Sequence, residues 1–295
     1  MDRKVQKALA VKITDELRKK IGITSIRVKT NRKNRPSITD SKFGGLPYWD
    51  LQKEYPVNED GKMLTMIAQI NLDKLNGSGF NVEGKLPQSG MLQFFVFFGD
   101  DCMYGLDCDN QVSQNGFRVV YHKQIDYAVQ ETDICTIGMP TSTDERLCDY
   151  SPIKGEAALD FSLDMIVHPD YGRFKELFIE MAHTYGWDIK QENKDVMLYY
   201  LIDSEIYEAI EEMTDSTGHR LLGYPYFTQF DPRIDYAEQY AEYDTLLFQM
   251  DTDDEDDSSD FSVMWGDCGV ANFFISGEDL AKQNFGNVLY NWDCC

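Results

Sequence analysis

The sequence has few basic residues for its size and no long run of apolar residues. Its 295 residues include 28 Lys and Arg against 51 Asp and Glu, a formal net charge of −23. Such a surface disfavours general binding of nucleic acid, because attraction to phosphate requires basic groups. No apolar run approaches the roughly 18 residues of a membrane helix, and charges interrupt the first ten residues, where an export signal would be apolar. We therefore expect no nucleic-acid partner, no membrane span and no export.

The sequence also lacks the even number of cysteines that a disulfide framework would use. Seven cysteines, an odd number in a chain of this length, are typical of reduced thiols in the cytoplasm rather than of a disulfide framework. We therefore predict a cytoplasmic protein. The Cys294-Cys295 pair follows the apolar run 288–292, which predicts that it ends a packed strand. A soft-metal or redox role for this pair is the alternative.

The common catalytic motifs are missing. The four histidines show no His-Glu-x-x-His spacing of a zinc hydrolase. The sequence has neither a Gly-x-Ser-x-Gly elbow nor a Gly-x-x-x-x-Gly-Lys phosphate loop. A Cys–His nucleophile stays open, since no cysteine has a partner that the sequence identifies. These absences favour a binding protein over an enzyme.

The charge is unevenly distributed along the chain. Residues 1–35 hold twelve basic and three acidic residues, which leaves 16 basic and 48 acidic residues for 36–295. One interpretation is that residues 1–35 form a basic helix and arm that folds onto the acidic body and partly neutralises it. The other is that this arm binds an acidic partner.

Hydrophobic periodicity predicts both helices and strands. Three segments have apolar residues at three- and four-residue spacing and are predicted helices: 2–22, 170–187 and 195–213. Six shorter segments are aromatic and β-branched between turn residues, and are predicted strands: 63–70, 90–98, 116–122, 244–250, 269–276 and 287–292. The expected class is α+β, with mostly antiparallel strands and with helices in the N-terminal and middle segments.

Three blocks recur in the same order at a nearly constant offset. The matches are 45–49 with 223–227, 68–71 with 248–251, and 90–96 with 269–275. Collinear matches of this kind predict an internal duplication. The resulting organisation is a basic helix and arm (1–35), a first repeat (36–155), a helical insertion (156–216) and a second repeat (217–295), in one compact unit. The seam between the two copies is the expected cleft.

Several motifs resemble the YwqG family. They are KFGGLPYW (42–49), LPQSGMLQFF (86–95), LLGYPYFTQFDPR (221–233), MWGDCGVANFFI (264–275) and LYNWDCC (289–295). The resemblance runs from about residue 40 to the C-terminus and is specific in order and spacing. It implies a bacterial protein of unknown function with a duplicated α+β fold, and it implies no catalytic residues.

The two copies differ in their acidic residues. The segment 251–267 has eight acids and no base. Clustered carboxylates suit a hard cation such as calcium or magnesium, and the candidate ligands are Asp251, Asp253, Asp254 and Asp267. An EF-hand is excluded, because this loop lacks glycine at its sixth position. The alternatives are a solvated acidic loop and a docking surface for a basic partner.

Aromatic residues accompany these acids. An aromatic wall with a few polar groups is typical of a small-molecule pocket, and equally of a strand-rich core. The candidate surface for a ligand or partner comprises Asp231, Gln249, Asp251, Asp253, Asp254, Trp265, Asp267 and Trp292.

Two functions are therefore expected. The first is a cytosolic binding protein without an evident cofactor, whose acidic surface in the second repeat docks a basic protein or a small ligand. The alternative is a metal-dependent enzyme that uses a divalent cation at these aspartates on a small or phosphorylated substrate.

Overall fold

The computed structural model describes residues 1–81, 84–99, 103–144, 151–190, 196–253 and 260–295. The chain divides into two compact units. The first comprises Met1–Ser25, Leu163–Thr217 and Gly223–Pro225, and the second comprises Ile26–Ser162, Gly218–Leu222 and Tyr226–Cys295. Within the described ranges, no helix has both the length and the apolar character needed to cross a membrane.

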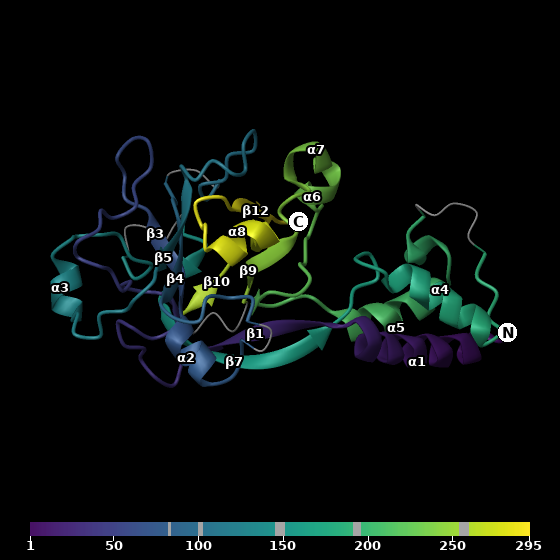
Figure 1. Cartoon of the computed structure of the whole chain (residues 1–295). Coiled ribbons are helices and arrows are strands. Elements are labelled where there is room, and N and C mark those ends of the chain that lie inside the picture. The colour runs from purple at the N-terminus through teal and green to yellow at the C-terminus, as the bar shows by residue number, and fades with distance from the viewer. Residues whose placement is uncertain (82–83, 100–102, 145–150, 191–195, 254–259) are drawn as a thin grey trace. The chain divides into compact units, whose positions relative to one another are not determined.

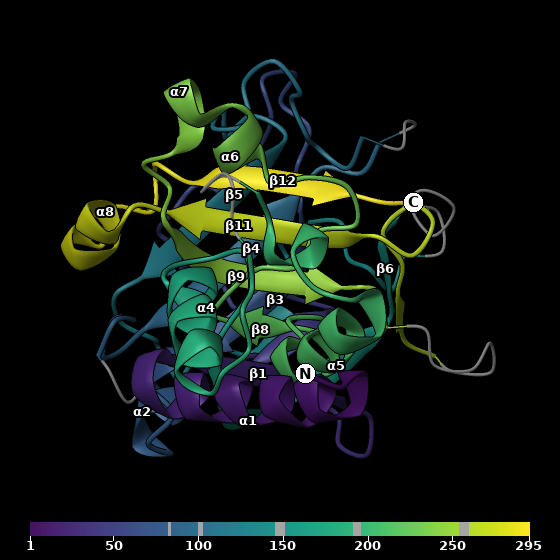
Figure 2. The same cartoon turned by 90° about the vertical axis from the view of Figure 1, so that its right-hand side faces the viewer.

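The first unit is helical. Its helices are α1 (Arg3–Ile21), α4 (Phe174–Thr184), the 3-10 turn η2 (Leu198–Tyr200) and α5 (Ser204–Thr214), and α1 lies against α4 and α5 (Figure 2). The three predicted helices are confirmed, although the third begins later than expected. It begins there because the side chain of Asp203 accepts a hydrogen bond from Glu205 N–H and caps the helix. Apolar stripes of Leu17, Phe178 and Ile210 form the core of this unit.

The second unit is built on a ten-stranded sheet with the order β12-β11-β9-β8-β1-β7-β2-β3-β4-β5 (Figure 1). The strands are β1 (Ile23–Asn31), β2 (Lys42–Gly44), β3 (Thr65–Asn71), β4 (Met91–Val96), β5 (Phe117–His122), β7 (Glu156–Ile166), β8 (Arg220–Leu221), β9 (Thr245–Asp251), β11 (Val270–Ile275) and β12 (Leu289–Asp293). The short β6 (Ile153–Lys154) and β10 (Ser262–Val263) pair separately. Short helices connect the strands: α2 (Leu72–Gly77), α3 (Glu131–Cys135), α6 (Pro232–Asp235), α7 (Ala237–Tyr240) and α8 (Gly277–Lys282). An α+β class is therefore confirmed.

All six predicted strands are present, but two long strands were not predicted. Residues 23–31 form β1 rather than part of a basic arm, and residues 156–166 form β7 rather than the start of a helical insertion. Both strands are only partly buried, so polar residues interrupt the apolar pattern that marks a strand. Beyond β1, Arg32 and Arg35 make ion pairs with Asp253, Glu131 and Glu156. This part of the basic segment therefore pairs with acids of its own unit, as the first interpretation of the charge proposes.

Aromatic rings fill the space between the two ends of the sheet. Phe94 of β4 lies 4.6 Å from Phe248 of β9 and 5.0 Å from Phe273 of β11, measured between ring centroids. Phe117 of β5 lies 5.0 Å from Tyr290 of β12. These rings are buried, so the space between the two halves of the sheet is a packed core and not the cleft that the sequence led us to expect there.

Candidate functional site

Three of the residues proposed from the sequence lie on or just beyond β9. Gln249 is fully buried, and its side chain accepts a hydrogen bond from Tyr226 N–H at 2.8 Å. Asp251 accepts hydrogen bonds from the N–H groups of Gly218 (2.6 Å) and Thr252 (2.8 Å), and burial raises the pKa of its carboxyl group. These two side chains therefore hold the backbone in place.

Asp253 pairs with His219, a residue that the sequence did not single out. The contact with His219, helped by Thr30 and Arg32, lowers the pKa of Asp253 despite its partial burial. His219 Nε2 lies 3.7 Å from the carboxylate, and Nδ1 accepts a hydrogen bond from Asp251 N–H at 3.1 Å. Because both ring nitrogens face protein groups, this histidine is a poor candidate for a general base.

The metal interpretation finds little support in the described part of the chain. Asp254 lies outside the described residues. Asp267 is exposed in the turn between Trp265 and Gly269, whereas Asp253 is engaged by Thr30 and His219. Within 1–253 and 260–295, apart from the gaps stated above, no group of three or more His, Cys, Asp or Glu is placed to hold a metal ion.

The remaining candidates serve local structure. Asp231 caps α6 and makes a two-point ion pair with Arg233, at 2.7 and 2.9 Å. Trp265 is fully buried, and its ring lies 6.3 Å from that of Trp292. Trp292 donates its indole N–H to the carbonyl of Met103 at 2.7 Å. The structure therefore brings the two tryptophans together, with Trp265 in the core and Trp292 partly buried against it.

The same buried contacts occur near both ends of the sheet. Tyr48 N–H donates to the Gln69 side chain at 2.9 Å, as Tyr226 N–H donates to Gln249. On the neighbouring strands, the amide groups of Gln93 and Asn272 donate to the carbonyls of Tyr48 and Tyr226, at 2.7 and 2.8 Å. Each pair of amides fixes a Pro-aromatic turn over its strand.

A cavity lies beside each of these two sets of buried hydrogen bonds. At the first, Ser41 Oγ accepts from Asn71 N–H at 2.9 Å, in the position where His219 accepts from Asp251 N–H. The cavity there has a volume of about 530 Å³, whereas the cavity beside His219 has about 290 Å³. The larger cavity falls within the usual size range of small-molecule pockets.

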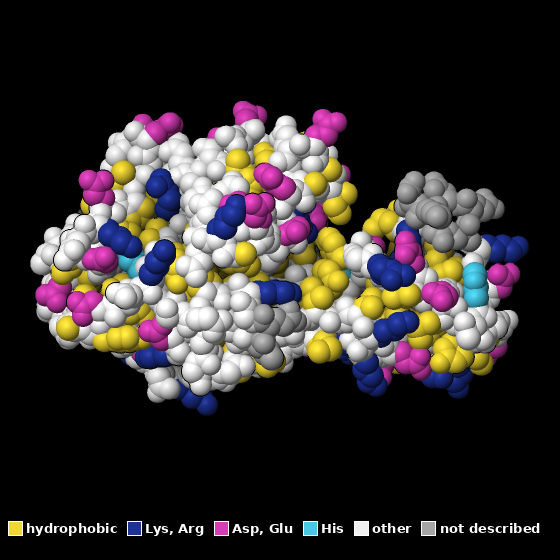
Figure 3. Space-filling view, viewed as in Figure 1, with side chains coloured by type: hydrophobic (Ala, Val, Ile, Leu, Met, Phe, Trp, Pro, Cys, Tyr) yellow, Lys and Arg dark blue, Asp and Glu magenta, His cyan; other side chains and the backbone are white. Residues whose placement is uncertain are grey.

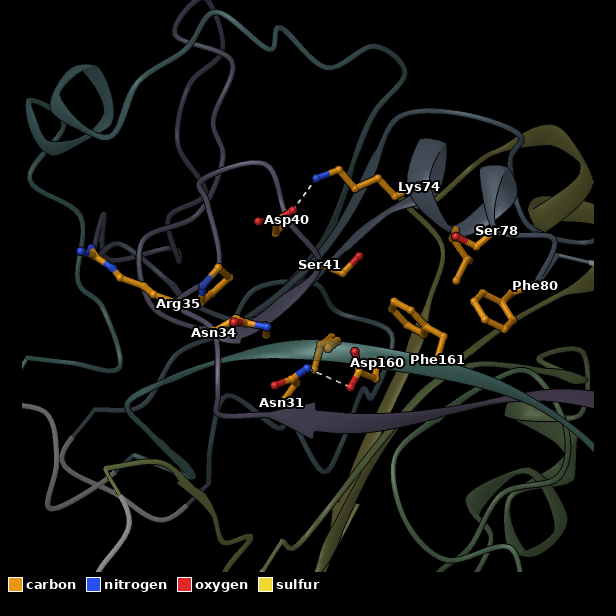
Figure 4. Close-up of a pocket in the computed structure, with 14 residues that line it drawn as sticks. Asn31, Asn34, Arg35, Asp40, Ser41, Lys74, Ser78, Phe80, Asp160 and Phe161 are labelled. Carbon is orange, nitrogen blue, oxygen red and sulfur yellow. Dashed lines mark hydrogen bonds and ion pairs between the residues drawn. The ribbon is translucent and has the colours of Figure 1, made fainter.

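We call the larger cavity the α2–β7 pocket (Figure 4). Four segments form it: the turn after β1, the residues before β2, α2 with the loop that follows it, and β7. Its lining residues are Asn31, Asn34, Arg35, Pro36, Asp40, Ser41, Lys74, Leu75, Ser78, Phe80, Ala158, Leu159, Asp160 and Phe161. All of them belong to the second unit.

Two polar pairs face each other across the α2–β7 pocket (Figure 4). On one side Lys74 makes an ion pair with Asp40. Burial alone would raise the pKa of Asp40, but hydrogen bonds from Lys74 and Ser37 outweigh it and lower that pKa. On the other side Asn31 donates to Asp160 at 3.0 Å. Charged groups of both signs therefore reach the pocket.

The rest of the lining is partly apolar. Phe80 and Phe161 pack with their ring centroids 6.2 Å apart and form a wall, and Leu75 lies buried at the floor. Arg35 lies at the other end of the pocket, and its guanidinium group extends away from this wall (Figure 4) to pair with Glu131 at 3.2 Å. The arrangement suits a ligand with charged groups at one end and an apolar group at the other.

Sequence reasoning missed this pocket, because its residues come from four separate segments. Asp160 and Phe161, for example, lie on β7, a strand that was not predicted. One signal could have shown His219: it precedes the second turn motif (223–227) by the same four residues by which Ser41 precedes the first (45–49).

The comparisons with known proteins do not name a reaction. None of the curated proteins matches this sequence. A family model described as a domain of unknown function, DUF1963, matches residues 41–294. These residues include both sets of buried hydrogen bonds and most of the α2–β7 pocket. The chain therefore belongs to the DUF1963 family.

Proposed function

We propose that the protein binds a small zwitterionic ligand, of the amino-acid type, in the α2–β7 pocket. The observation that carries this proposal is the balance of the lining: Arg35 and Lys74 supply positive charge, and Asp40 and Asp160 supply negative charge. A ligand carboxylate would face Arg35 and Lys74, and its ammonium group would face Asp160. An apolar side chain would lie on Phe80 and Phe161.

The same balance argues against a polyphosphate ligand. Such a ligand needs an excess of cations or a run of backbone N–H groups. Here the lining holds two carboxylates, Asp40 and Asp160, against the two cations Arg35 and Lys74. A phosphate-rich ligand would meet the carboxylates as well as the cations, which costs free energy.

Binding should require both charged groups of the ligand. Titration calorimetry with L-phenylalanine is expected to give saturable binding in about the millimolar range or tighter. Phenylpropionate, which lacks the ammonium group, and phenethylamine, which lacks the carboxylate, should each bind on the order of tenfold more weakly. Equal affinity for all three would contradict the proposed charge recognition.

Asp160→Asn tests the site itself. This variant should weaken L-phenylalanine binding by about tenfold, because it removes the negative charge that faces the ammonium group. Asp60→Asn is the matched control, since Asp60 is exposed in a turn outside the pocket. If both variants bind as the unaltered protein does, the ligand does not occupy this pocket.

An internal duplication is part of the proposal. It is supported by the recurring sequence blocks, by the matched contacts of Gln69 and Gln249, and by a sheet order in which β2-β3-β4-β5 and β8-β9-β11-β12 run outward from the middle.

The narrower kinship with the YwqG family and a bacterial origin rest on the motifs 42–49 and 264–275. A cytoplasmic location rests on the odd number of cysteines.

A second candidate function is the docking of a basic partner on an acidic surface of the second repeat. The α6–α7 surface comprises Phe230, Ile234, Asp235, Tyr236, Glu238 and Glu242, all exposed. Ile234 is 61% exposed and Tyr236 52%, and Figure 3 shows acidic and hydrophobic side chains together over α6 and α7. Exposed apolar groups surrounded by charge are typical of interaction sites, and these acids fit a partner with basic groups around an apolar side chain.

A synthetic peptide of alternating lysine and leucine tests this surface. The peptide should bind at low salt, and Ile234→Ser should weaken binding by roughly threefold or more, because an apolar anchor is lost. Leu51→Ser is the control, since Leu51 is 52% exposed outside this surface. Equal effects of the two variants would show that the peptide responds to net charge alone.

A further inference from the structure

Three cysteines meet at one corner of the second unit. Cys268 lies in the turn between Trp265 and Gly269, just before β11, and Cys294 and Cys295 directly follow β12. All three are free thiols. Cys268 and Cys295 are exposed, and Cys294 is partly exposed.

The pairing of β11 with β12 brings these segments together. Val270 lies opposite Asp293 in the last residue pair of the two antiparallel strands. Cys268 therefore lies two residues beyond this pair on one side, and Cys294 and Cys295 lie one and two residues beyond it on the other. Cys295 N–H donates to the Asp267 carbonyl at 3.3 Å, so the two segments stay in contact beyond the last strand pair.

The side chain of Cys294 lies against the same turn. A Cβ atom added to Gly266 would be 2.7 Å from Cys294 Sγ, and one added to Gly269 would be 2.7 Å from Cys294 Cβ. The turn that carries Cys268 is therefore in direct contact with Cys294. A disulfide requires such a close approach, because its Cβ atoms are about 3.5–4.5 Å apart. Cys268 has a left-handed backbone, with a φ of 59°.

We propose that Cys268 and the Cys294-Cys295 pair form a dithiol site that is oxidised to an intramolecular disulfide by a peroxide. The thiolate of one cysteine attacks a peroxide oxygen, which breaks the O–O bond and gives a sulfenic acid and water. A second thiolate attacks the sulfenic sulfur and displaces water, which forms the S–S bond. Two thiols are oxidised, and one hydrogen peroxide is reduced to two waters.

Oxidation with hydrogen peroxide and peptide mapping test this site. The treated protein should lose two titratable thiols, and the mapped disulfide should join the peptide of Cys268 to that of Cys294 and Cys295. Thioredoxin or dithiothreitol should restore both thiols. A disulfide that excludes Cys268, or no disulfide while single thiols become sulfinic acid, would overturn the proposal.

Matched variants show whether the disulfide forms because Cys268 lies near Cys294 and Cys295, or only because the thiols are exposed. Cys268→Ser should abolish the disulfide and leave the remaining thiols to over-oxidise. Cys108→Ser and Cys135→Ser are the controls, since both cysteines are exposed but lie in the loop before β5 and on α3. Either control variant losing the disulfide would also contradict the assignment.

Discussion

Replacement of Lys42 by alanine is expected to lower the free energy of unfolding by roughly 3 kcal/mol, which is the usual cost of breaking a buried ion pair. Lys42 is 1% exposed on β2, and its Nζ lies 3.2 Å from Glu156 Oε2 at the start of β7. Burial lowers the pKa of Lys42, although Glu156 opposes this shift. Among the described residues, alanine would leave the Glu156 carboxylate with Arg35 as its remaining ion-pair partner, at 3.7 Å. Denaturation with guanidinium chloride measures the loss.

A double variant provides the control for this pair. In Lys42→Met/Glu156→Leu both charges are absent, and most of the lost stability should return, because apolar residues of similar volume often replace a buried ion pair without cost. The pair joins β2 to β7, which carry Ser41 and Asp160 to the α2–β7 pocket. A loss below about 1 kcal/mol in Lys42→Ala would place this pair among surface ion pairs instead.

Lowering the pH from about 7 to about 4 should reduce the free energy of unfolding by about 3 kcal/mol through the protonation of His122 alone. His122 is 1% exposed, and burial followed by the charge of Lys53 lowers its pKa to about 4. Nε2 contacts Gln93 Oε1 at 3.0 Å, and Nδ1 lies 3.4 Å from Lys53 Nζ. The neutral ring therefore fits both neighbours, whereas a protonated ring would face a second cation.

The direction of this pH dependence follows from the pKa of His122 in the folded and in the unfolded chain. Unfolded His122 has an ordinary pKa near 6.5, so between pH 6.5 and 4 the unfolded chain binds more protons than the folded one. The stabilising contribution is complete above pH 6.5 and is lost as the pH falls towards 4. His122→Gln should show a smaller loss of stability over this range in denaturant titrations than the unaltered protein does. Equal pH dependence in the His122 variant would contradict this role.

The sequence predicted the elements with a strong apolar pattern. β4 and β11 are buried at every residue, and they are the aromatic strands whose recurrence is visible without coordinates. By contrast, β7 alternates irregularly between buried and exposed residues, so its periodicity did not distinguish it from the helices that follow. β1 was hidden by its basic residues, which favoured an arm over a strand.

The candidate site was harder to predict for a different reason. Sequence proximity drew attention to Asp251 and Asp253, which use their oxygens to hold backbone and neighbouring side chains. The α2–β7 pocket depends instead on Asp40 and Asp160, which are far apart in the chain and meet because β2 pairs with both β3 and β7. Such convergence follows from sheet order, which short motifs do not encode.

A crystal structure of the protein grown with L-phenylalanine tests the proposed function most directly. Electron density for the amino acid is expected in the α2–β7 pocket, with its ammonium group at Asp160, its carboxylate at Arg35 or Lys74, and its ring on Phe80 and Phe161. An empty pocket at a saturating concentration, or density at another site alone, would contradict it.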